Sequence, residues 1–344
     1  MKIFKLKSKH KKILADTLSP VSIYMKIRDV FSNSLLLESS EYNQNNKNFS
    51  YVCCNPIASI QIKKNQLITQ YPDGKKIIEN ISKDTSVTDK IHSFSQQFEV
   101  KDYPFKFISN GLFGYIGHEA IEYFENIKLN ETKRGHEIPD LYYAIYQNII
   151  AISLFNHEAH IFSHTYNTNH NIEIISQLLQ SNHISTFKFK KVGVKNSNLT
   201  DNQFIDFVLK AKEHCQRGDV FQLVLSRSFS QKFHGDEFNV YRSLRSINPS
   251  PYLFFFDYGN FKIFGSSPEA QLIIENNVAE IHPIAGTFRR TGDDKKDAIS
   301  ALKLAKDPKE NSEHIMLVDL ARNDLSRNGS NVVVEKNREI QFFS

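Results

Sequence analysis

The sequence contains no tryptophan and only three cysteines, and it has no long run of apolar residues. Two of the cysteines, Cys53 and Cys54, are adjacent and so rarely bridge each other, while Cys215 has no spaced partner. No His/Cys spacing resembles a zinc site. Because a disulfide framework and a zinc framework are both excluded, reduced thiols in a cytoplasmic setting are expected.

Membrane-spanning and nucleic-acid-binding proteins are also disfavoured. No stretch approaches the ~18 apolar residues that a membrane helix needs, and the N-terminus lacks the apolar region of a secretory signal. Lys and Arg number 43 against 38 Asp and Glu, and part of the excess lies in the first dozen residues. A nucleic-acid-binding face usually concentrates more positive charge. The basic start is therefore interpreted as a solvated strand or arm.

What is present is typical of a soluble globular chain. The 344 residues, with 40% hydrophobic and 24% charged residues, suffice for one large core or two ordinary domains. Residues 188–198 are polar and lysine-rich, and we place a boundary there. It separates an N-terminal region, residues 1–190, from a second region, residues 195–344.

Turn residues separate short apolar runs at hairpin spacing. Turns are predicted at Pro72-Asp73-Gly74, Tyr258-Gly259-Asn260 and Glu275-Asn276-Asn277. Helices are predicted over residues 171–180, 200–218 (capped by Thr200) and 238–246, and a strand over residues 221–233. Hairpin spacing without βαβ crossovers favours an α+β fold with largely antiparallel β-sheets and helices packed outside. The glycines of NGLFGYIGHEA (110–120) match no dinucleotide fingerprint and indicate tight packing in a sheet.

Residues 281–327 carry the most chemistry. Gly286-Thr287 offers an uncrowded backbone amide and a hydroxyl donor, which suit a carboxylate or a carbonyl. Arg289 and Arg290 are suited to bidentate carboxylate contacts. The alternative is a loop with solvated arginines.

The helix that follows Lys306 has its own start signals. Asp307 is a natural N-cap, Pro308 suits the first helical position, and Glu310 stands where a capping box requires it. Glu313 lies one turn further on the same face. Two carboxylates at this spacing suit Mg²⁺. Helix capping and amphipathicity already explain the same pattern, however, and on the spacing alone this structural interpretation is preferred. The turn 248–252 (NPSPY) is rigid and polar, and it suits either a connector or a ligand site.

Five segments occur in a characteristic order: DVFQLVLSRSFS (219–230), NPSPYLFFF (248–256), FGSSPEAQL (264–272), HPIAGTFRRTG (282–292) and EHIMLVDLARNDLSR (313–327). Their order and spacing resemble component I of anthranilate synthase, a chorismate-utilising enzyme. Upstream, SPVSIYMKIRD, SLLLESS and NGLFGYIGHEA resemble its N-terminal region. The resemblance covers essentially the whole chain and implies the chorismate-utilising enzyme fold.

Two positions distinguish branches of that family. Relatives that add water usually carry a lysine base where this chain has Gln222, and glutamine cannot deprotonate water. Aminodeoxychorismate synthases often carry a lysine nucleophile where this chain has Ala285. Both positions favour the anthranilate branch. Two alternatives remain. One is aminodeoxychorismate synthase component I, and the other is a non-catalytic remnant that binds tryptophan or docks a glutaminase.

The resemblance implies a lyase that converts chorismate and ammonia to anthranilate and pyruvate, the first step of tryptophan biosynthesis. It implies Mg²⁺ as cofactor, a glutamine amidotransferase subunit (component II) as ammonia source in a hetero-oligomer, and feedback inhibition by tryptophan in the N-terminal region. By resemblance, Gly286 and Thr287 contact chorismate, and Glu313, with Glu310 as second candidate, ligates Mg²⁺. The implied tryptophan-binding residues are Glu38, Ser39, Asn248, Pro251, Tyr252 and Leu253.

Family members continue beyond the position of Ser344. There they carry a histidine-bearing strand, a GxxSGAPK-like segment and a second metal carboxylate. No catalytic residue is therefore identified in residues 1–344. We expect the chain as given to hold the N-terminal part of the chorismate-binding domain, to have a fold incomplete at the C-terminal end, and to lack catalysis.

Overall fold

The computed structural model describes residues 2–39, 49–82, 84–129 and 137–342. Contacts divide the chain into two compact units, one formed by Met1–Ser185 with Leu244–Ser344 and the other by Thr186–Ser243. The predicted boundary near residue 190 coincides with the start of the second unit, while the first unit takes in residues from both predicted regions. The functional division into residues 1–190 and 195–344 stays a prediction.

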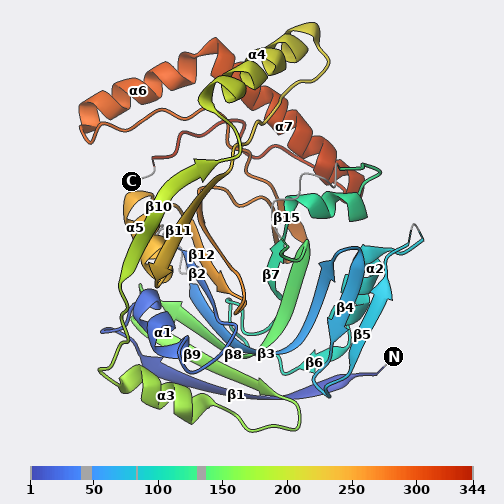
Figure 1. Cartoon of the computed structure of the whole chain (residues 1–344), viewed down its shortest axis with the longest axis vertical. Coiled ribbons are helices and arrows are strands. Elements are labelled where there is room, and N and C mark those ends of the chain that lie inside the picture. Colours follow the sequence, from blue (N-terminus) through green and yellow to red (C-terminus); the bar gives the residue numbers. More distant parts are fainter. Residues whose placement is uncertain (1, 40–48, 83, 130–136, 343–344) are drawn as a thin grey trace. The chain divides into compact units, whose positions relative to one another are not determined.

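The elements of the first unit come from both ends of the chain (Figure 1). Before residue 186 they are β1 (Phe4–Leu14), α1 (Pro20–Ile27), β2 (Leu35–Ser39), β3 (Ser50–Lys63), β4 (Gln66–Gln70), β5 (Lys76–Asn80), α2 (Val87–Ser95), β6 (Phe98–Val100), β7 (Phe113–Ile116), the 3-10 helix η1 (His118–Tyr123), β8 (Leu141–Ser153), β9 (Glu158–Thr165) and α3 (Ile172–Gln180). After residue 243 they are β12 (Tyr252–Asp257), β13 (Lys262–Ser267), β14 (Ile273–Glu275), β15 (Val278–Glu280), α6 (Asp294–Lys306) and α7 (Pro308–Asn328). The second unit contains β10 (Phe189–Ser197), α4 (Asp201–Arg217) and β11 (Phe229–Gly235); α5 (Phe238–Ile247) crosses from it into the first.

One 11-stranded sheet dominates the first unit. Its order is β13-β12-β2-β3-β8-β9-β1-β6, with β4 and β5 continuing from β3 and β7 pairing with β8. All of these pairs are antiparallel except β1 with β6. The predicted α+β fold with largely antiparallel sheets is therefore confirmed. The sheet joins strands from the two ends of the sequence, because β12 pairs with β2.

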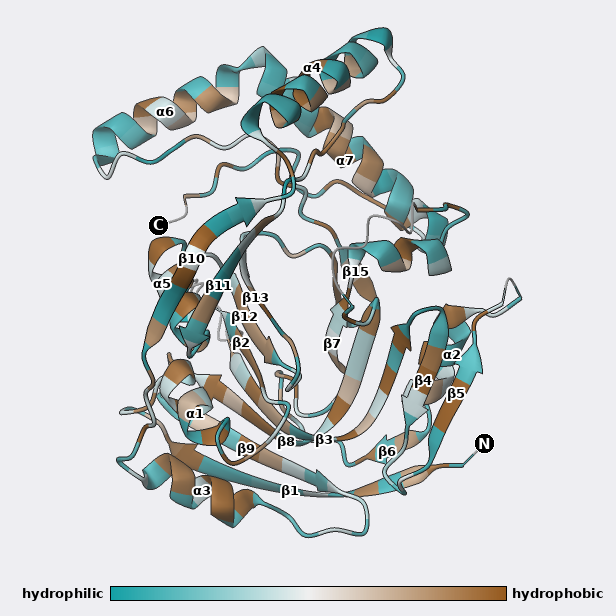
Figure 2. Cartoon of the chain, in the orientation of Figure 1, coloured by the Kyte–Doolittle hydropathy of each residue, from teal (hydrophilic) through white to brown (hydrophobic). Residues whose placement is uncertain are grey.

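The core lies around β8 and β9. From Ala144 to Ser153 every residue of β8 is buried, which is the continuous pattern of a strand covered on both faces. Helices α1 and α3 bury apolar faces, and Figure 2 shows hydrophobic residues on both helices and on the strands. None of the helices in the described part of the chain has the length and hydropathy to span a membrane.

Local signals place the helices and hairpins well. Helix α4 follows Thr200, which forms a capping box with Gln203, and it ends at Gly218 in the left-handed region at φ 76°. The predicted helices over residues 171–180 and 238–246 are α3 and α5. The turn at Gly74, with φ 84°, joins β4 to β5 as predicted. These predictions are confirmed. They could be made from the sequence because each feature depends on residues that are neighbours in the chain.

The predicted strand over residues 221–233 is wrong in its first half. Strand β11 begins at Phe229, where its pairing with Ser197 of β10 begins, and residues 221–228 have no regular structure. Phe221 is 93% exposed and Val224 is 86% exposed. An apolar run forms a strand only where a neighbouring strand satisfies its backbone groups. Within the described residues, β10 pairs with β11 only from residue 229 onward.

The glycine-rich segment 110–120 contains a close backbone approach. Gly114 lies in β7 opposite Tyr143 of β8, and a Cβ at Gly114 would overlap the carbonyl oxygen of Tyr142. A side chain there would force the two backbones apart. The interpretation of this segment as tight packing within a sheet is therefore confirmed.

Acid destabilisation is expected from the buried His164. Its Nε2 donates to the carbonyl of Ser109 at 2.8 Å, its Nδ1 accepts from the hydroxyl of Ser8 at 2.8 Å, and burial lowers its pKa below 6.5. The unfolded chain therefore takes up a proton first as the pH falls below about 6.5. We expect the free energy of unfolding, from urea denaturation, to fall between pH 7 and pH 5, by at most about 1.4 kcal/mol per pH unit for this group.

The variant His164→Gln should show a smaller fall over the same pH range. His183→Gln, at an exposed position, provides the matched control and should behave as the wild type. An unchanged pH dependence in His164→Gln would show that this histidine does not limit acid stability.

Candidate functional site

The segment after β15 brings two predicted site residues together. Residues 281–291 have no regular structure and lead into α6. The space in front of the Cα atom of Gly286 is filled by the carboxylate of Glu310, and a Cβ at this position would overlap Oε2 of Glu310. Gly286 has no positive φ, so its backbone conformation does not require glycine, and a side chain here would displace the Glu310 carboxylate. A predicted substrate residue thus lies against a predicted metal ligand.

The start of α7 explains why the Glu310 carboxylate is available. Asp307 caps the helix, since its Oδ1 accepts from the amides of Lys309 and Glu310 at 2.9 and 3.2 Å. The amide of Asp307 itself donates to the carbonyl of Leu304 at the end of α6. The predicted N-cap is confirmed, but the predicted capping box is wrong, because the Glu310 side chain does not accept from the amide of Asp307. Since α6 runs directly into α7, that amide already donates to the carbonyl of Leu304.

The two glutamates offer oxygen ligands on successive turns of α7. The Glu310 side chain is 19% exposed, with Oε1 3.6 Å from Nζ of Lys309, and Glu313 is half-buried. No group of three or more His, Cys, Asp or Glu side chains gathers in a metal-binding arrangement among the residues described. This donor set fits Mg²⁺, which takes one or two carboxylates and completes its shell with waters and substrate oxygens. It does not fit a closed metal cage made only of protein ligands.

The arginines that follow Thr287 have different surroundings. Arg290 donates from Nε to Oδ2 of Asp297 at 3.1 Å, and its guanidinium carbon lies 5.7 Å from the ring centroid of Phe342. Arg289 and Thr287 are exposed. Arg290 is therefore engaged within the protein, and Arg289 remains the better candidate for a substrate contact.

Sequence reasoning missed both α6 and Asp297. A signal for the helix existed, because Asp293 is a natural N-cap and accepts from the amides of Lys295 and Lys296. No sequence signal showed that Asp297 would be buried, at 4% exposure, on a helix with no other buried residue.

Four of the six residues implied to bind tryptophan are register partners on two strands. Strands β2 and β12 are labelled in Figure 1, and their register places Ser39 opposite Tyr252 and Glu38 opposite Leu253. Since successive side chains of a strand point to opposite faces, Ser39 and Tyr252 share one face and Glu38 and Leu253 share the other. The structure therefore brings these segments together but does not place Glu38 and Ser39 on one surface.

The polar groups around this strand pair are partly engaged. The buried carboxylate of Glu38 has both oxygens 3.1 Å from Nε of Arg245. The carbonyl of Asn248 accepts from the hydroxyl of Ser266 at 2.7 Å, and Pro251 is buried. The amide of Ser39 donates to the hydroxyl of Ser50 at 3.3 Å.

The two positions that distinguish branches of the family lie in different units. Ala285 is half-buried and precedes Gly286 in the first unit, whereas Gln222 is exposed in the irregular segment before β11 in the second.

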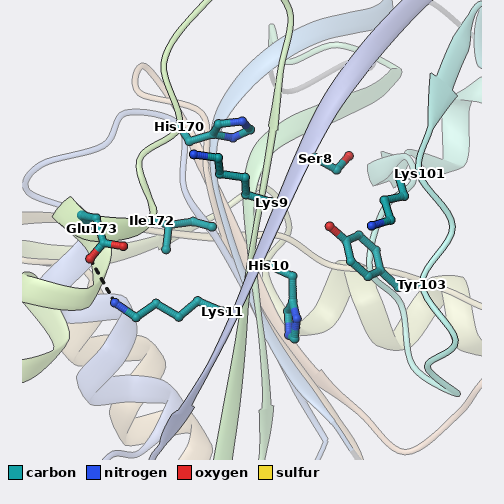
Figure 3. A pocket seen from close by; sticks show the side chains of 9 residues that line it. All are labelled: Ser8, Lys9, His10, Lys11, Lys101, Tyr103, His170, Ile172 and Glu173. Carbon is teal, nitrogen blue, oxygen red and sulfur yellow. Dashed lines mark hydrogen bonds and ion pairs between the residues drawn. The ribbon is translucent and has the colours of Figure 1, made fainter.

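A basic hollow of about 490 Å³ lies elsewhere in the first unit, along β1 (Figure 3). Its lining residues are Ser8, Lys9, His10, Lys11, Lys101, Tyr103, His170, Ile172 and Glu173. Lys11 pairs with Glu173 at 3.0 Å. None of the predicted site residues lines this hollow. We therefore do not assign the hollow as the chorismate or tryptophan site, despite its size.

Comparison with known proteins agrees with the arrangement of these segments. Residues 32–344 match the family of chorismate binding enzymes. The chain belongs to this family. The chorismate binding enzymes most similar in sequence include anthranilate synthase component 1 of Lactococcus lactis, 32% identical over 93% of this chain and 70% of the relative. The corresponding protein of Aquifex aeolicus is 30% identical over 92% of this chain and 66% of the relative.

Solved structures of chorismate binding enzymes share the fold. Anthranilate synthase component I from Streptococcus pneumoniae superposes with a TM-score of 0.62 at 26% identity, over 92% of this chain and 68% of that one. The menaquinone-specific isochorismate synthase of Escherichia coli superposes with a TM-score of 0.61 at 13% identity, over 95% of this chain and 65% of that one. At this identity the likeness supports the fold alone. The chain spans about two thirds of the length of these proteins. The resemblance to anthranilate synthase component I and the predicted fold are confirmed.

Proposed function

We propose that this chain belongs to the large subunit of an anthranilate synthase of cytoplasmic tryptophan biosynthesis, the enzyme that converts chorismate and ammonia to anthranilate and pyruvate. The observation that carries the proposal is the placement of Gly286 directly against the Glu310 carboxylate. It joins a segment suited to a carboxylate substrate with a segment suited to Mg²⁺. The names of the relatives support the same activity.

Each residue has a defined task in this proposal. The amide of Gly286 and the hydroxyl of Thr287 donate hydrogen bonds to a carboxylate or carbonyl of chorismate. Glu313 and Glu310 would hold Mg²⁺, which would supply positive charge to offset the substrate carboxylates. Gln222 cannot deprotonate water, which favours ammonia as the nucleophile. Ala285 provides no amine for covalent attack on the ring.

Ammonia would come from glutamine through a separate amidotransferase subunit, which makes a hetero-oligomer the proposed working form. The use of component numbers in the names of the relatives supports a second component. Co-purification of the chain with that subunit, followed by a glutamine-dependent assay, tests this part separately from the chemistry on chorismate.

The proposed activity is tested by supplying ammonium directly. The purified chain is incubated with chorismate, Mg²⁺ and ammonium, and the products are separated by chromatography with anthranilate detected by fluorescence. Chorismate binding is measured in parallel by calorimetry with and without Mg²⁺. We expect chorismate binding that requires Mg²⁺, and anthranilate as the aromatic product of any turnover. Isochorismate or aminodeoxychorismate as product, or binding indifferent to Mg²⁺, would reject the assignment.

We also propose that the β2–β12 strand pair binds tryptophan as a feedback inhibitor. The pairing of Ser39 with Tyr252 beside buried Pro251 supports this role. Tryptophan at a hundred times its dissociation constant should raise the free energy of unfolding by about 2.7 kcal/mol.

The variant Ser39→Phe should lose the stabilisation by tryptophan, because the larger side chain fills the face that Ser39 shares with Tyr252. Ser93→Phe, at an exposed position on α2, should retain it. Thermal unfolding with and without tryptophan measures both variants. Full stabilisation of Ser39→Phe would place tryptophan elsewhere.

A further inference from the structure

Asp297 is a buried carboxylate whose partners all lie in the segment that carries Gly286. It is the single buried residue of α6, although the helix has apolar side chains such as Ile299 and Leu302, which are 54% and 62% exposed. Burying a carboxylate is unfavourable unless hydrogen bonds and an opposite charge compensate it. The burial of Asp297 in preference to its apolar neighbours indicates that strong contacts hold it in place.

Three donors meet on this carboxylate. Oδ1 accepts from the amide of Thr291 at 2.7 Å and from its hydroxyl at 2.8 Å, and Oδ2 accepts from Nε of Arg290 at 3.1 Å. The Thr291 bonds and the Arg290 charge lower the pKa of Asp297 to about 2, so the group stays ionised at neutral pH. Contacts of a charged group with several donors are among the strong hydrogen bonds of proteins.

The backbone around these contacts forms a closed turn. Gly292, between Thr291 and the cap residue Asp293, adopts φ 80°, a left-handed conformation that glycine adopts without strain. The amide of Asp293 donates to the Thr291 hydroxyl at 3.3 Å. The end of the segment is thereby tied to the first turn of α6. Asp307 then joins α6 directly to α7, the helix that carries Glu310.

We propose that Asp297 is a positioning residue, which anchors Arg290 and Thr291 and so holds Gly286 against Glu310. The effect on chorismate binding rests on the proposed function, whereas the anchoring of the segment does not. Asp297 touches neither substrate nor metal in this scheme. It acts by restricting the segment to the conformation in which Gly286 lies against the carboxylate of Glu310.

The test compares three variants of the full chain. Asp297→Ala removes all three contacts, Asp297→Asn keeps an acceptor oxygen but removes the charge, and Asp294→Ala removes an exposed acid from the same turn as a matched control. Hydrogen exchange, followed by mass spectrometry, is measured on peptides covering residues 284–292 and, as a check of the core, on β8. Calorimetry gives the chorismate affinity in Mg²⁺.

We expect the Thr291 amide, which donates to Asp297 at 2.7 Å, to lose its protection from exchange in Asp297→Ala with β8 unchanged. We also expect this variant to bind chorismate about tenfold more weakly, the lower end of what loss of a supporting partner costs a metal site. Asp297→Asn should lie between Asp297→Ala and the wild type, and Asp294→Ala should match the wild type. Unchanged exchange in residues 284–292, or equal loss of protection in β8, would overturn the inference. If the wild type binds no chorismate, the proposed function fails, and the exchange data alone decide the role of Asp297.

Discussion

Replacing Glu313 by alanine is expected to weaken the Mg²⁺-dependent binding of chorismate about a hundredfold. A contact to a charged group contributes about 1.5–3 kcal/mol, and each 1.4 kcal/mol is a factor of about ten in affinity. Glu313 is half-buried one turn after Glu310, whose carboxylate lies against Gly286. Calorimetric titration of chorismate at saturating Mg²⁺ gives the affinity.

The control for this experiment lies on the same helix. Asp324→Ala removes the same charge from an exposed position of α7 and should leave the affinity within about twofold, since exposed charges far from a site contribute little. Glu310→Ala should also weaken binding, because its carboxylate is the one in contact with Gly286. Binding by Glu313→Ala that still depends on Mg²⁺ with unchanged affinity would remove Glu313 from the metal site.

Truncating Phe162 to alanine should destabilise the first unit by about 3–5 kcal/mol, the usual cost of deleting a buried aromatic side chain. Phe162 lies in β9 with no exposed surface. Its ring is 4.7 Å from that of His10, 5.2 Å from that of Tyr103 and 5.8 Å from that of Phe105, measured between centroids. Removing the Phe162 ring leaves a cavity. The three neighbouring rings could fill this cavity only if the backbone segments that carry them moved. Urea denaturation measures the change in free energy of unfolding.

Phe155→Ala makes the same substitution at a position that is 76% exposed. Its cost should be within about 0.5 kcal/mol of zero, as is usual for surface substitutions. Similar losses in the two variants would mean that the β8–β9 region is not the cooperative core of the unit, contrary to the continuous burial of these strands.

Local structure was predicted where local chemistry decides it. The helix from Thr200 to Gly218 was recognised from its two caps, because a threonine at the N-cap and a glycine at the C-terminus satisfy backbone groups within a few residues. The hairpin turns at Gly74 and at Asn276-Asn277 were recognised for the same reason, since these residues tolerate positive φ. The strand predicted from residue 221 was wrong because pairing with a distant strand, not composition, decides where a strand begins.

The candidate site divides in the same way. By itself the sequence determined the caps, the hairpins, the antiparallel α+β class and, through resemblance, the family and the residues to consider. Only the tertiary structure decided that Glu310 faces Gly286 instead of capping its helix, that Ser39 pairs with Tyr252, and that the carboxylate of Asp297 is buried against Arg290 and Thr291. Each of these depends on which segments, distant or adjoining, lie within a few ångströms of one another, and such contacts arise from packing and strand pairing that no local pattern encodes.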